Sequence, residues 1–283
     1  MTGVRRVLVT GGTGTTGSRV ARLLVAQGVT PVVASRSGGG GGSGAETAAF
    51  DWSDEASTIR VLEQSRPDAV YLVAPARDPE PVDAMRPLLA AARGLGVRRA
   101  VLLGAKPVSA GDPGLGAVYD VVRDSFDEAV ILRPTWFQQD FVAAHYLAAM
   151  VREGVLRTAS LSGRIAYIDA DDVAAVAAAA LTAEVPLAGE LLLTGPEALS
   201  GEETAAILSR ELGRRIDAEH VSETALSDAL ARTLPPALAA ALAHADATYT
   251  DTEPTDVVER ITGRLPLSLA RFVHEAHSSG VLD

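Results

Sequence analysis

The sequence predicts an α/β protein: a Rossmann-type, doubly wound parallel sheet with a smaller C-terminal α+β lobe. Short apolar runs alternate with helical stretches through the first half of the chain, which is the pattern of βαβ units. A glycine-rich loop directly follows the first apolar run. The 283 residues, 47% of them hydrophobic, suffice for a full core with an appended lobe. We expect residues 1–155 to form the Rossmann domain and residues 156–283 mainly the lobe, with some strands returning to the sheet.

The strands are expected where short runs of valine, leucine, isoleucine and alanine lie between helical stretches. In chain order these runs are Val4–Thr10, Val32–Ser35, Ala48–Phe50, Ala69–Val73, Ala100–Gly104, Ala129–Arg133, Arg164–Ile168 and Glu190–Leu193. Ala21–Val25 has helical apolar spacing and predicts the first helix. The longest apolar run, Val173–Leu181, is too short to cross a membrane and predicts a buried, alanine-rich helix.

The loop after the first strand has the spacing of a dinucleotide phosphate cradle. Gly11, Gly14 and Gly17 follow the pattern TGxxGxxG, and Gly12 begins an overlapping GxGxxG. Because glycines have no side chain, they let backbone N–H groups at the start of a helix approach a pyrophosphate closely. The alternative is a strand-turn-helix whose glycines only permit tight packing.

The end of the second strand bears on which dinucleotide binds. A Rossmann fold usually carries an acidic residue there that bonds the ribose 2′-hydroxyl, but Ser35 and Arg36 occupy that place in this chain. A guanidinium pairs with a 2′-phosphate, which a carboxylate would repel. We therefore expect NADP(H) rather than NAD(H) as the cofactor, unless Arg36 is merely solvated.

The ends of the third and fourth strands are also expected to contact the cofactor. Asp51 and Trp52 follow the third strand, where a side chain can reach the adenine amine. Ala74 and Pro75 end the fourth strand and should pass the middle of the cofactor, since ligands in open α/β sheets lie beyond the carboxyl ends of the strands. The segment Gly38–Gly44 borders this region, and its composition is typical of a flexible loop or an engineered linker.

Composition and charge exclude several functions. A formal net charge of −11 argues against nucleic-acid binding, which needs a basic surface, and we expect no membrane partner. The chain has no cysteine and no signal peptide before the first strand, so we expect a cytoplasmic protein. Asp169, Asp171 and Asp172 precede a helix, where carboxylates cap N–H groups, and we therefore expect no metal site.

With these motifs the chain resembles the NmrA-like atypical short-chain dehydrogenases/reductases. The resemblance covers essentially the whole chain and is closest to the agroclavine-dehydrogenase branch, which reduces ergot-alkaloid iminium ions, and to NAD(P)H-dependent quinone and azo reductases. Besides the glycine loop, the segments that carry it are Ala34–Arg36, Phe50–Trp52, Tyr71–Pro75, Ile131–Phe137, Ala166–Asp169 and Leu193–Pro196.

This resemblance implies a Rossmann domain with a C-terminal substrate lobe. It implies that the segment from Pro134 to Phe137 borders the nicotinamide, with Pro134 itself contacting the cofactor. The other cofactor-binding residues that it implies are Gly11, Thr13, Gly14, Thr15, Thr16, Gly17 and Arg36.

The acid of ordinary short-chain dehydrogenases is missing from this chain. In those enzymes a Tyr, with a Lys four residues later and a Ser at the end of the fifth strand, protonates a carbonyl oxygen. Here Gly111–Leu115 lies where the Tyr and Lys should be, and Gly104 takes the Ser position. Tyr119 and Arg123 have the same i, i+4 spacing about two turns later, so Tyr119 is a candidate catalytic residue. The alternative is a tyrosine of the helix surface or of the core.

Lys106 is the second candidate catalytic residue. It is the only lysine of the chain and follows the fifth strand, where the reacting end of the cofactor should lie. It could donate a proton or anchor the substrate. The alternative is a solvated loop residue.

The missing acid favours acceptors that need none. Hydride addition to an iminium ion creates no alkoxide, so iminium ions, quinones and enones fit this chain better than ketones. Catalysis would then rest on holding the acceptor near C4 of the nicotinamide and excluding water. The residues expected to line the substrate pocket, unless they pack as core after the sixth strand, are Trp136, Phe137, Gln138, Phe141 and His145.

We therefore expect an NADPH-dependent oxidoreductase that transfers hydride to a small conjugated or cationic organic molecule. One alternative is a non-catalytic NADP(H) sensor, and only that alternative requires a protein partner. The other is a redox-neutral isomerase or cyclase, because a fold does not fix the chemistry.

Overall fold

The computed structural model describes residues 3–75, 78, 80–142, 145–160, 163–248 and 252–282. The chain divides into two compact units. The first is built from residues 1–134, 170–193 and 260–263, and the second from residues 135–169, 194–259 and 264–283. The chain passes from the first unit to the second after residue 134, where its sixth strand ends, whereas the sequence prediction put this boundary after residue 155. Residues 170–193 then return to the sheet of the first unit.

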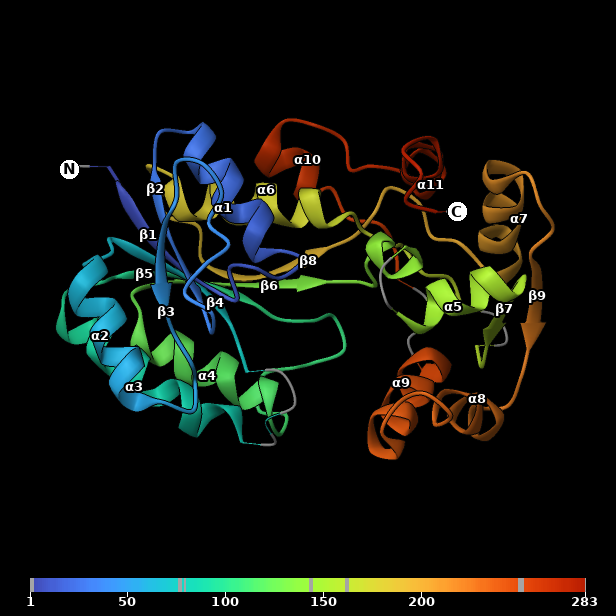
Figure 1. Cartoon of the computed structure of the whole chain (residues 1–283), viewed down its shortest axis with the longest axis horizontal. Helices are drawn as coiled ribbons and strands as arrows, with labels where there is room; N and C mark the ends of the chain where they lie inside the picture. Colours follow the sequence, from blue (N-terminus) through green and yellow to red (C-terminus); the bar gives the residue numbers. More distant parts are fainter. Residues whose placement is uncertain are drawn as a thin grey trace. The chain divides into compact units, whose positions relative to one another are not determined.

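The first unit contains a seven-stranded parallel sheet (Figure 1). Its spatial order is β3-β2-β1-β4-β5-β6-β8, and every neighbouring pair is parallel. The strand order reverses between β1 and β4, so the carboxyl ends of these two strands open the crevice where a doubly wound sheet binds ligands. The strands are β1 Arg6–Thr10, β2 Thr30–Ser35, β3 Glu46–Ala49, β4 Ala69–Val73, β5 Arg99–Leu103, β6 Glu128–Pro134 and β8 Gly189–Leu193. The Rossmann-type prediction is confirmed.

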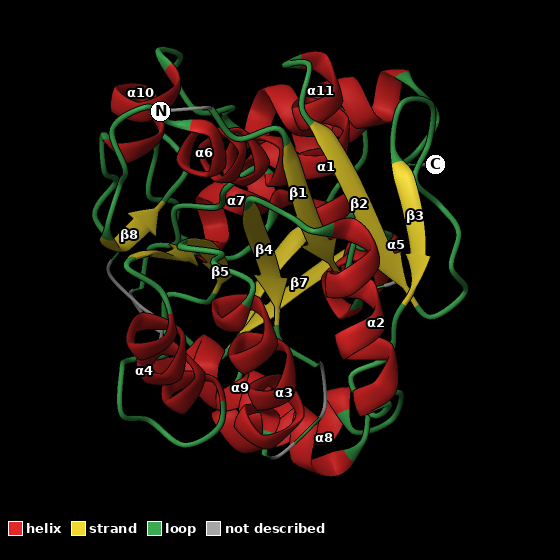
Figure 2. Ribbon diagram, turned by 90° about the vertical axis from the view of Figure 1, so that its left-hand side faces the viewer, coloured by secondary structure: helices red, strands yellow, loops and turns green. Residues whose placement is uncertain are grey.

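Helices cover both faces of this sheet (Figure 2). On one face α1 Gly17–Ala26 packs beside α6 Ala170–Thr182, and Asp171 of α6 pairs with Arg19 and Arg22 of α1. Asp171 therefore joins two helices, where the sequence had predicted only capping. The run Val173–Leu181 is helical and mostly buried, as expected. The helices on the other face are α2 Glu55–Ser65, α3 Pro81–Gly94 and α4 Leu115–Ser125.

The core of the first unit lies between the sheet and α2, α3 and α4. Leu8, Val70, Leu102 and Ile131 come from four neighbouring strands, and their side chains are fully buried. Strands covered on both faces read as continuous apolar runs, which is why the sequence identified them. Each such side chain contributes about 1.5–3 kcal/mol by its burial.

The second unit is mainly helical. It also holds a two-stranded parallel sheet of β7 Val155–Thr158 and β9 Asp217–His220, neither of which the sequence predicted. Both strands are short, and β9 is polar. Phe141, Leu208 and Val273 lie at the centre of its core. Its helices are the 3₁₀ helix η1 Gln138–Phe141 and α5 Tyr146–Glu153, α7 Gly201–Leu212, α8 Glu223–Leu230, α9 Pro236–Thr248 and α11 Leu269–Ser278, while α10 Val257–Thr262 crosses the unit boundary in the chain.

The strand expected at Arg164–Ile168 is absent from the described residues, and that prediction was wrong. The segment makes only isolated bridges, antiparallel from Ile165 to Leu199 and parallel from Ile168 to Phe137. It therefore bonds two different chain segments in turn and runs beside neither long enough to form a strand. Within the described part of the chain, every helix is too short or too polar to cross a bilayer.

Candidate nucleotide-binding site

A cavity of about 900 Å³ lies at the carboxyl ends of β1, β2 and β4 in the first unit. This position and size are those of a cofactor site in an open α/β sheet. It brings together nine of the residues predicted to bind cofactor: Gly11, Thr13, Gly14, Ser35, Arg36, Asp51, Trp52, Ala74 and Pro75. The lining residues that the sequence did not indicate are Ala34, Phe50, Ser53, Val73 and Asp78.

The glycine loop packs tightly at some positions and is open at others. Gly11 has φ +61°, a left-handed conformation that favours glycine. A Cβ on Gly17 would overlap the carbonyl oxygen of Gly11, so a side chain there would push α1 away from the loop. A Cβ on Gly14 would meet only that same oxygen, at 3.2 Å, and Gly14 lines the cavity. The tight positions hold the first turn of α1 next to the open one, and the start of a helix is where backbone N–H groups can meet an anion.

The buried side chain of Thr16 helps to hold the start of α1 beside the sheet. Its side chain is buried, and its Oγ1 accepts a hydrogen bond of 2.9 Å from the hydroxyl of Tyr71 on β4. Thr10 adds a second link between β1 and β4, because its Oγ1 accepts from the N–H of Val73 at 2.8 Å. The Thr16 side chain thus anchors the start of α1, and any cofactor contact of Thr16 would fall to its backbone. Thr15 is exposed, and its carbonyl accepts from Arg19.

The part of the cavity at the carboxyl ends of β2 and β3 has polar and aromatic walls. Asp51 Oδ1 accepts from the N–H and the hydroxyl of Ser53 at 2.9 and 2.8 Å. These bonds, with a smaller effect of Arg36, lower the pKa of Asp51, so its carboxylate is charged at neutral pH. Trp52 packs edge to face on Phe50, with ring centroids 4.7 Å apart. Arg36 is exposed at the rim, where its guanidinium can meet an anionic ligand.

The glycine-rich segment 38–44 folds back onto the glycine loop that follows β1. Ser35 Oγ donates to the carbonyl of Gly39 at 2.9 Å, which ties the segment to the end of β2. A Cβ on Gly40 would lie 2.5 Å from Cγ2 of Thr13, and Gly40 has φ +92°. The segment thus lies against Thr13, which lines the cavity, and its bordering of an adenine site stays a prediction.

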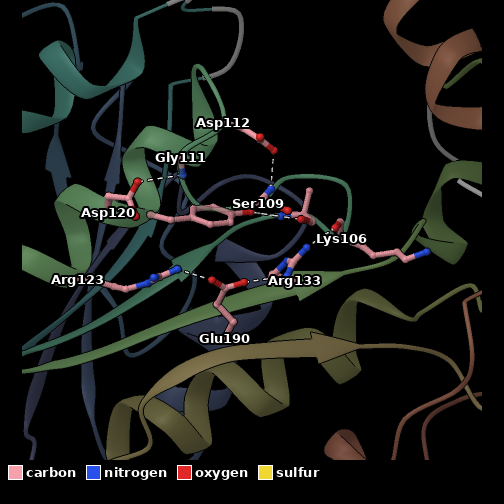
Figure 3. A network of polar contacts seen from close by, with 10 residues as sticks. Lys106, Ser109, Gly111, Asp112, Asp120, Arg123, Arg133 and Glu190 are labelled. Carbon is pink, nitrogen blue, oxygen red and sulfur yellow. Dashed lines mark hydrogen bonds and ion pairs between the residues drawn. The ribbon is translucent and has the colours of Figure 1, made fainter. Parts of the chain in front are cut away.

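A network of polar contacts holds the loop that follows β5 (Figure 3). The N–H of Lys106 donates to the carbonyl of Pro134 at 2.9 Å, and the carbonyl of Lys106 accepts from Arg133 Nη2 at 2.6 Å. Arg133 also pairs with Glu190 of β8 at 2.8 Å, and Glu190 pairs with Arg123 of α4. The backbone of Lys106 is therefore fixed beside the end of β6, while its partly exposed side chain extends away from the network (Figure 3).

Tyr119 of α4 hydrogen-bonds the same loop, the one that follows β5. Its ring is fully buried, and its hydroxyl oxygen accepts from the N–H of Ala105 at 2.8 Å. Burial raises the pKa of Tyr119. A Cβ on Gly104 would overlap the Tyr119 hydroxyl, so the glycine in the expected serine position makes room for this tyrosine. These contacts give Tyr119 a structural role, and proton transfer by Tyr119 stays a prediction.

We expect Glu190→Ala to lower the free energy of unfolding by about 1–2 kcal/mol, because it leaves the partly buried guanidinium of Arg133 and the exposed one of Arg123 without their carboxylate. Urea unfolding measures the loss. The matched control is Asp127→Ala, which removes the exposed pair of Asp127 with Arg98 and should cost about 0.5 kcal/mol or less. Equal losses in the two variants would contradict a special role for the network.

The second unit holds the residues predicted to line a substrate pocket. Trp136 and Phe137 are partly exposed, and Trp136 meets the ring of Tyr146 edge-on at 6.4 Å. Phe141 is fully buried in the core. Gln138 is also buried, and its Nε2 donates to the carbonyls of Tyr167 and Leu267 at 3.0 and 2.8 Å. Gln138 and Phe141 thus have structural contacts, and the substrate role of the whole set stays a prediction.

His145 has a neighbour that the sequence did not indicate. Its Nε2 lies 4.0 Å from Oδ1 of Asp140, and its Nδ1 accepts from the N–H of Leu147 at 3.4 Å, capping α5. Burial raises the pKa of Asp140 to about 7 and lowers that of His145 to about 4. An aspartate between two glutamines and a phenylalanine gives no sign of burial in the sequence, because burial here depends on contacts with distant segments.

Comparison with known proteins agrees with this geometry. The NAD dependent epimerase/dehydratase family matches residues 7–114. The uncharacterized oxidoreductase YesF of Bacillus subtilis is 38% identical over 96% of this chain and 95% of its own. Festuclavine dehydrogenase easG of Aspergillus fumigatus is 34% identical over 95% of this chain and 97% of its own. The NADPH-dependent quinone oxidoreductase QOR2 of Escherichia coli, complexed with NADPH, shares the fold, with a TM-score of 0.82 at 22% identity over 96% of this chain and 99% of that one.

Proposed function

The chain belongs to the NmrA-like atypical short-chain dehydrogenases/reductases, an oxidoreductase family that includes its clavine dehydrogenase relatives, and we propose that it reduces a small organic acceptor with NADPH. The acceptor is conjugated or cationic: an iminium ion, a quinone or an enone. The observation that carries the proposal is the cavity at the carboxyl ends of β1 and β2, which the open glycine loop and Arg36 both line.

The residues of this cavity fit NADPH. The backbone around Gly14, at the start of α1, would bind the pyrophosphate. Arg36 would pair with the 2′-phosphate, and the charged carboxylate of Asp51 would accept from the adenine amine. Ala74 and Pro75 leave room for the middle of the cofactor. When bound, the dihydronicotinamide would supply the hydride.

Two sets of residues that do not line the cavity are proposed to act on the substrate. One is Lys106, and the other is the aromatic pair Trp136 and Phe137 of the second unit. The network fixes the backbone of Lys106, whose ammonium group would anchor the acceptor or donate a proton. In the second unit Trp136 and Phe137 offer flat aromatic surface to a conjugated ring. The rate enhancement would come mainly from holding the acceptor in position and excluding water.

We expect Arg36→Ala to weaken NADPH binding by about 30-fold, or roughly 2 kcal/mol, while leaving the weaker binding of NADH unchanged. The physical reason is the loss of charge-assisted hydrogen bonds to the 2′-phosphate, which NADH lacks. Isothermal titration calorimetry measures both affinities. Arg60→Ala, which removes another exposed arginine of the first unit, is the matched control. Unchanged NADPH affinity in Arg36→Ala would show that Arg36 is only solvated.

Turnover separates the proposed reductase from its two alternatives. Oxidation of NADPH with an iminium, quinone or enone acceptor supports a reductase. Tight binding without oxidation across these acceptors favours the sensor, and product formed without net use of NADPH favours an isomerase or cyclase.

A further inference from the structure

Arg36 lies inside a turn that hydrogen bonds close on both sides of it. The turn runs from Ser35, the last residue of β2, to Gly39. The carbonyl of Ser35 accepts from the N–H of Gly38 at 3.0 Å, and the hydroxyl of Ser35 donates to the carbonyl of Gly39 at 2.9 Å. Ser35 therefore bonds the chain beyond Arg36 with both its backbone and its side chain. We call residues 35–39 the Arg36 turn.

The Arg36 turn is also fixed to the sheet and to the glycine loop. The carbonyl of Ser35 accepts a second hydrogen bond, from the N–H of Phe50 at 3.0 Å, where the chain leaves β3. Ser35 is 7% exposed, so water competes little for these bonds. One residue earlier, the carbonyl of Ala34 accepts from the N–H of Gly12 at 3.4 Å. The backbone at the start of the turn thus has partners on both neighbouring segments.

The conformation of the turn favours glycine at position 38. Gly38 has φ +68°, which is left-handed. A Cβ on Gly38 would meet Cβ of Ala49 at 3.4 Å, an ordinary contact, so the obstacle to a side chain is the backbone conformation and not a lack of space. The glycine-rich composition, which suggested a flexible loop, therefore serves a defined conformation at the start of this segment.

The hydrogen bonds of Ser35 limit what its hydroxyl can do for a ligand. A serine hydroxyl has one proton, and in Ser35 the carbonyl of Gly39 takes it. Since a phosphate accepts hydrogen bonds, Ser35 in this arrangement has no proton to give to a 2′-phosphate. Ser37 Oγ lies 3.4 Å from Ser35 Oγ, and for the same reason any bond within that pair is donated by Ser37.

We propose that Ser35 is a positioning residue that favours NADPH over NADH by acting through Arg36. This inference rests on the proposed function. A long arginine side chain loses entropy when its guanidinium is ordered on an anion, and a fixed backbone lowers that loss. The Arg36 turn supplies the fixed backbone. Breaking the turn weakens the contact with the 2′-phosphate and leaves the contacts with the rest of the dinucleotide in place.

Ser35→Ala tests this proposal, because it removes the bond to Gly39 with a small change in volume. We expect it to weaken NADPH binding by about fivefold and NADH binding by less than about twofold, as measured by isothermal titration calorimetry on the full chain. The matched control is Ser125→Ala in α4, which also removes a hydroxyl that donates to a backbone carbonyl, that of Val121 at 2.7 Å, and should change neither affinity. Unchanged NADPH affinity in Ser35→Ala, or equal losses for the two dinucleotides, would overturn the proposal.

A double-mutant cycle with Arg36→Ala separates positioning from direct contact. If Ser35 acts through Arg36, adding Ser35→Ala to Arg36→Ala has no further effect on NADPH affinity. If Ser35 instead bonds the cofactor itself, the two losses add, and that result would also overturn the proposal.

A second pair of variants disturbs the turn and leaves Ser35 in place. Gly38→Ala and Gly42→Ala both put alanine into a left-handed conformation, at φ +68° and +64°. Gly42 lies outside the turn, and a Cβ there would meet nothing within 4 Å. We expect the ratio of NADPH to NADH affinity to fall by about fivefold in Gly38→Ala and to stay within about twofold in Gly42→Ala.

These glycine variants keep the proposal testable if Ser35→Ala does not fold. An unchanged affinity ratio in Gly38→Ala, or an equal fall in Gly42→Ala, would show that the turn does not position Arg36. A wild-type chain that binds NADPH no more tightly than NADH is a different outcome, because it would overturn the NADPH dependence of the proposed function itself.

Discussion

Replacing Gly17 with alanine is expected to abolish measurable NADPH binding and to lower the free energy of unfolding by about 3 kcal/mol. The added Cβ would overlap the carbonyl oxygen of Gly11 and lie 2.9 Å from both the carbonyl carbon of Gly11 and Cα of Gly12. These are backbone atoms, so no side-chain rotation can relieve the overlap. The first turn of α1 must then move away from the loop, and its N–H groups no longer meet the pyrophosphate. Calorimetric titration and urea unfolding measure the two effects.

The matched control for this change is Gly94→Ala. Gly94 is the last residue of α3, and a Cβ there would meet nothing within 4 Å. Alanine is the better helix former, so stability should be unchanged or rise by up to about 1 kcal/mol, with binding unaffected. Normal NADPH affinity in Gly17→Ala would show that the loop is a packing element and not a phosphate cradle.

The first unit could be predicted because its signals are local. Strands covered on both faces are continuous apolar runs, and the glycine spacing marks the first βα turn. The carboxyl ends of parallel strands meet at one edge of the sheet. The positions of Arg36, Asp51 and Trp52 at that edge could therefore be predicted once the strand ends were known, and all three line the cavity in the structure.

The features that escaped prediction depend on contacts between distant segments. The side chain of Thr16 turns inward because Tyr71, 55 residues later, donates to it. β7 and β9 are short, and their pairing joins residues about sixty positions apart, as in Val155 with Asp217. Asp140 is ordinary in sequence and unusual only through its burial. Neither periodicity nor spacing carries information of this kind.

Replacing Gly104 with alanine is the second large effect that we expect, a loss of about 3 kcal/mol in the free energy of unfolding. The Cβ would overlap the hydroxyl of Tyr119 and lie 2.7 Å from its Cζ and 2.9 Å from the carbonyl oxygen of Leu132. The tyrosine ring is buried among α4, β5 and β6 and has no empty space to enter. A serine, as ordinary short-chain dehydrogenases have here, would meet the same obstacle. Thermal and urea unfolding measure the loss.

A double-mutant cycle with Tyr119→Phe tests the physical cause. Alone, Tyr119→Phe should cost about 1 kcal/mol, because the N–H of Ala105 loses its acceptor. In the double variant the overlapping hydroxyl is absent while Cζ remains at 2.7 Å, so the combined loss should be smaller than the sum of the two. Additive losses would mean that another contact, such as the Leu132 carbonyl, limits Gly104. The reductase rate of Tyr119→Phe distinguishes the two possible roles of this tyrosine. If Tyr119 only supports the loop, the rate should be largely retained. If Tyr119 is the catalytic acid, the rate should fall by about 100-fold or more.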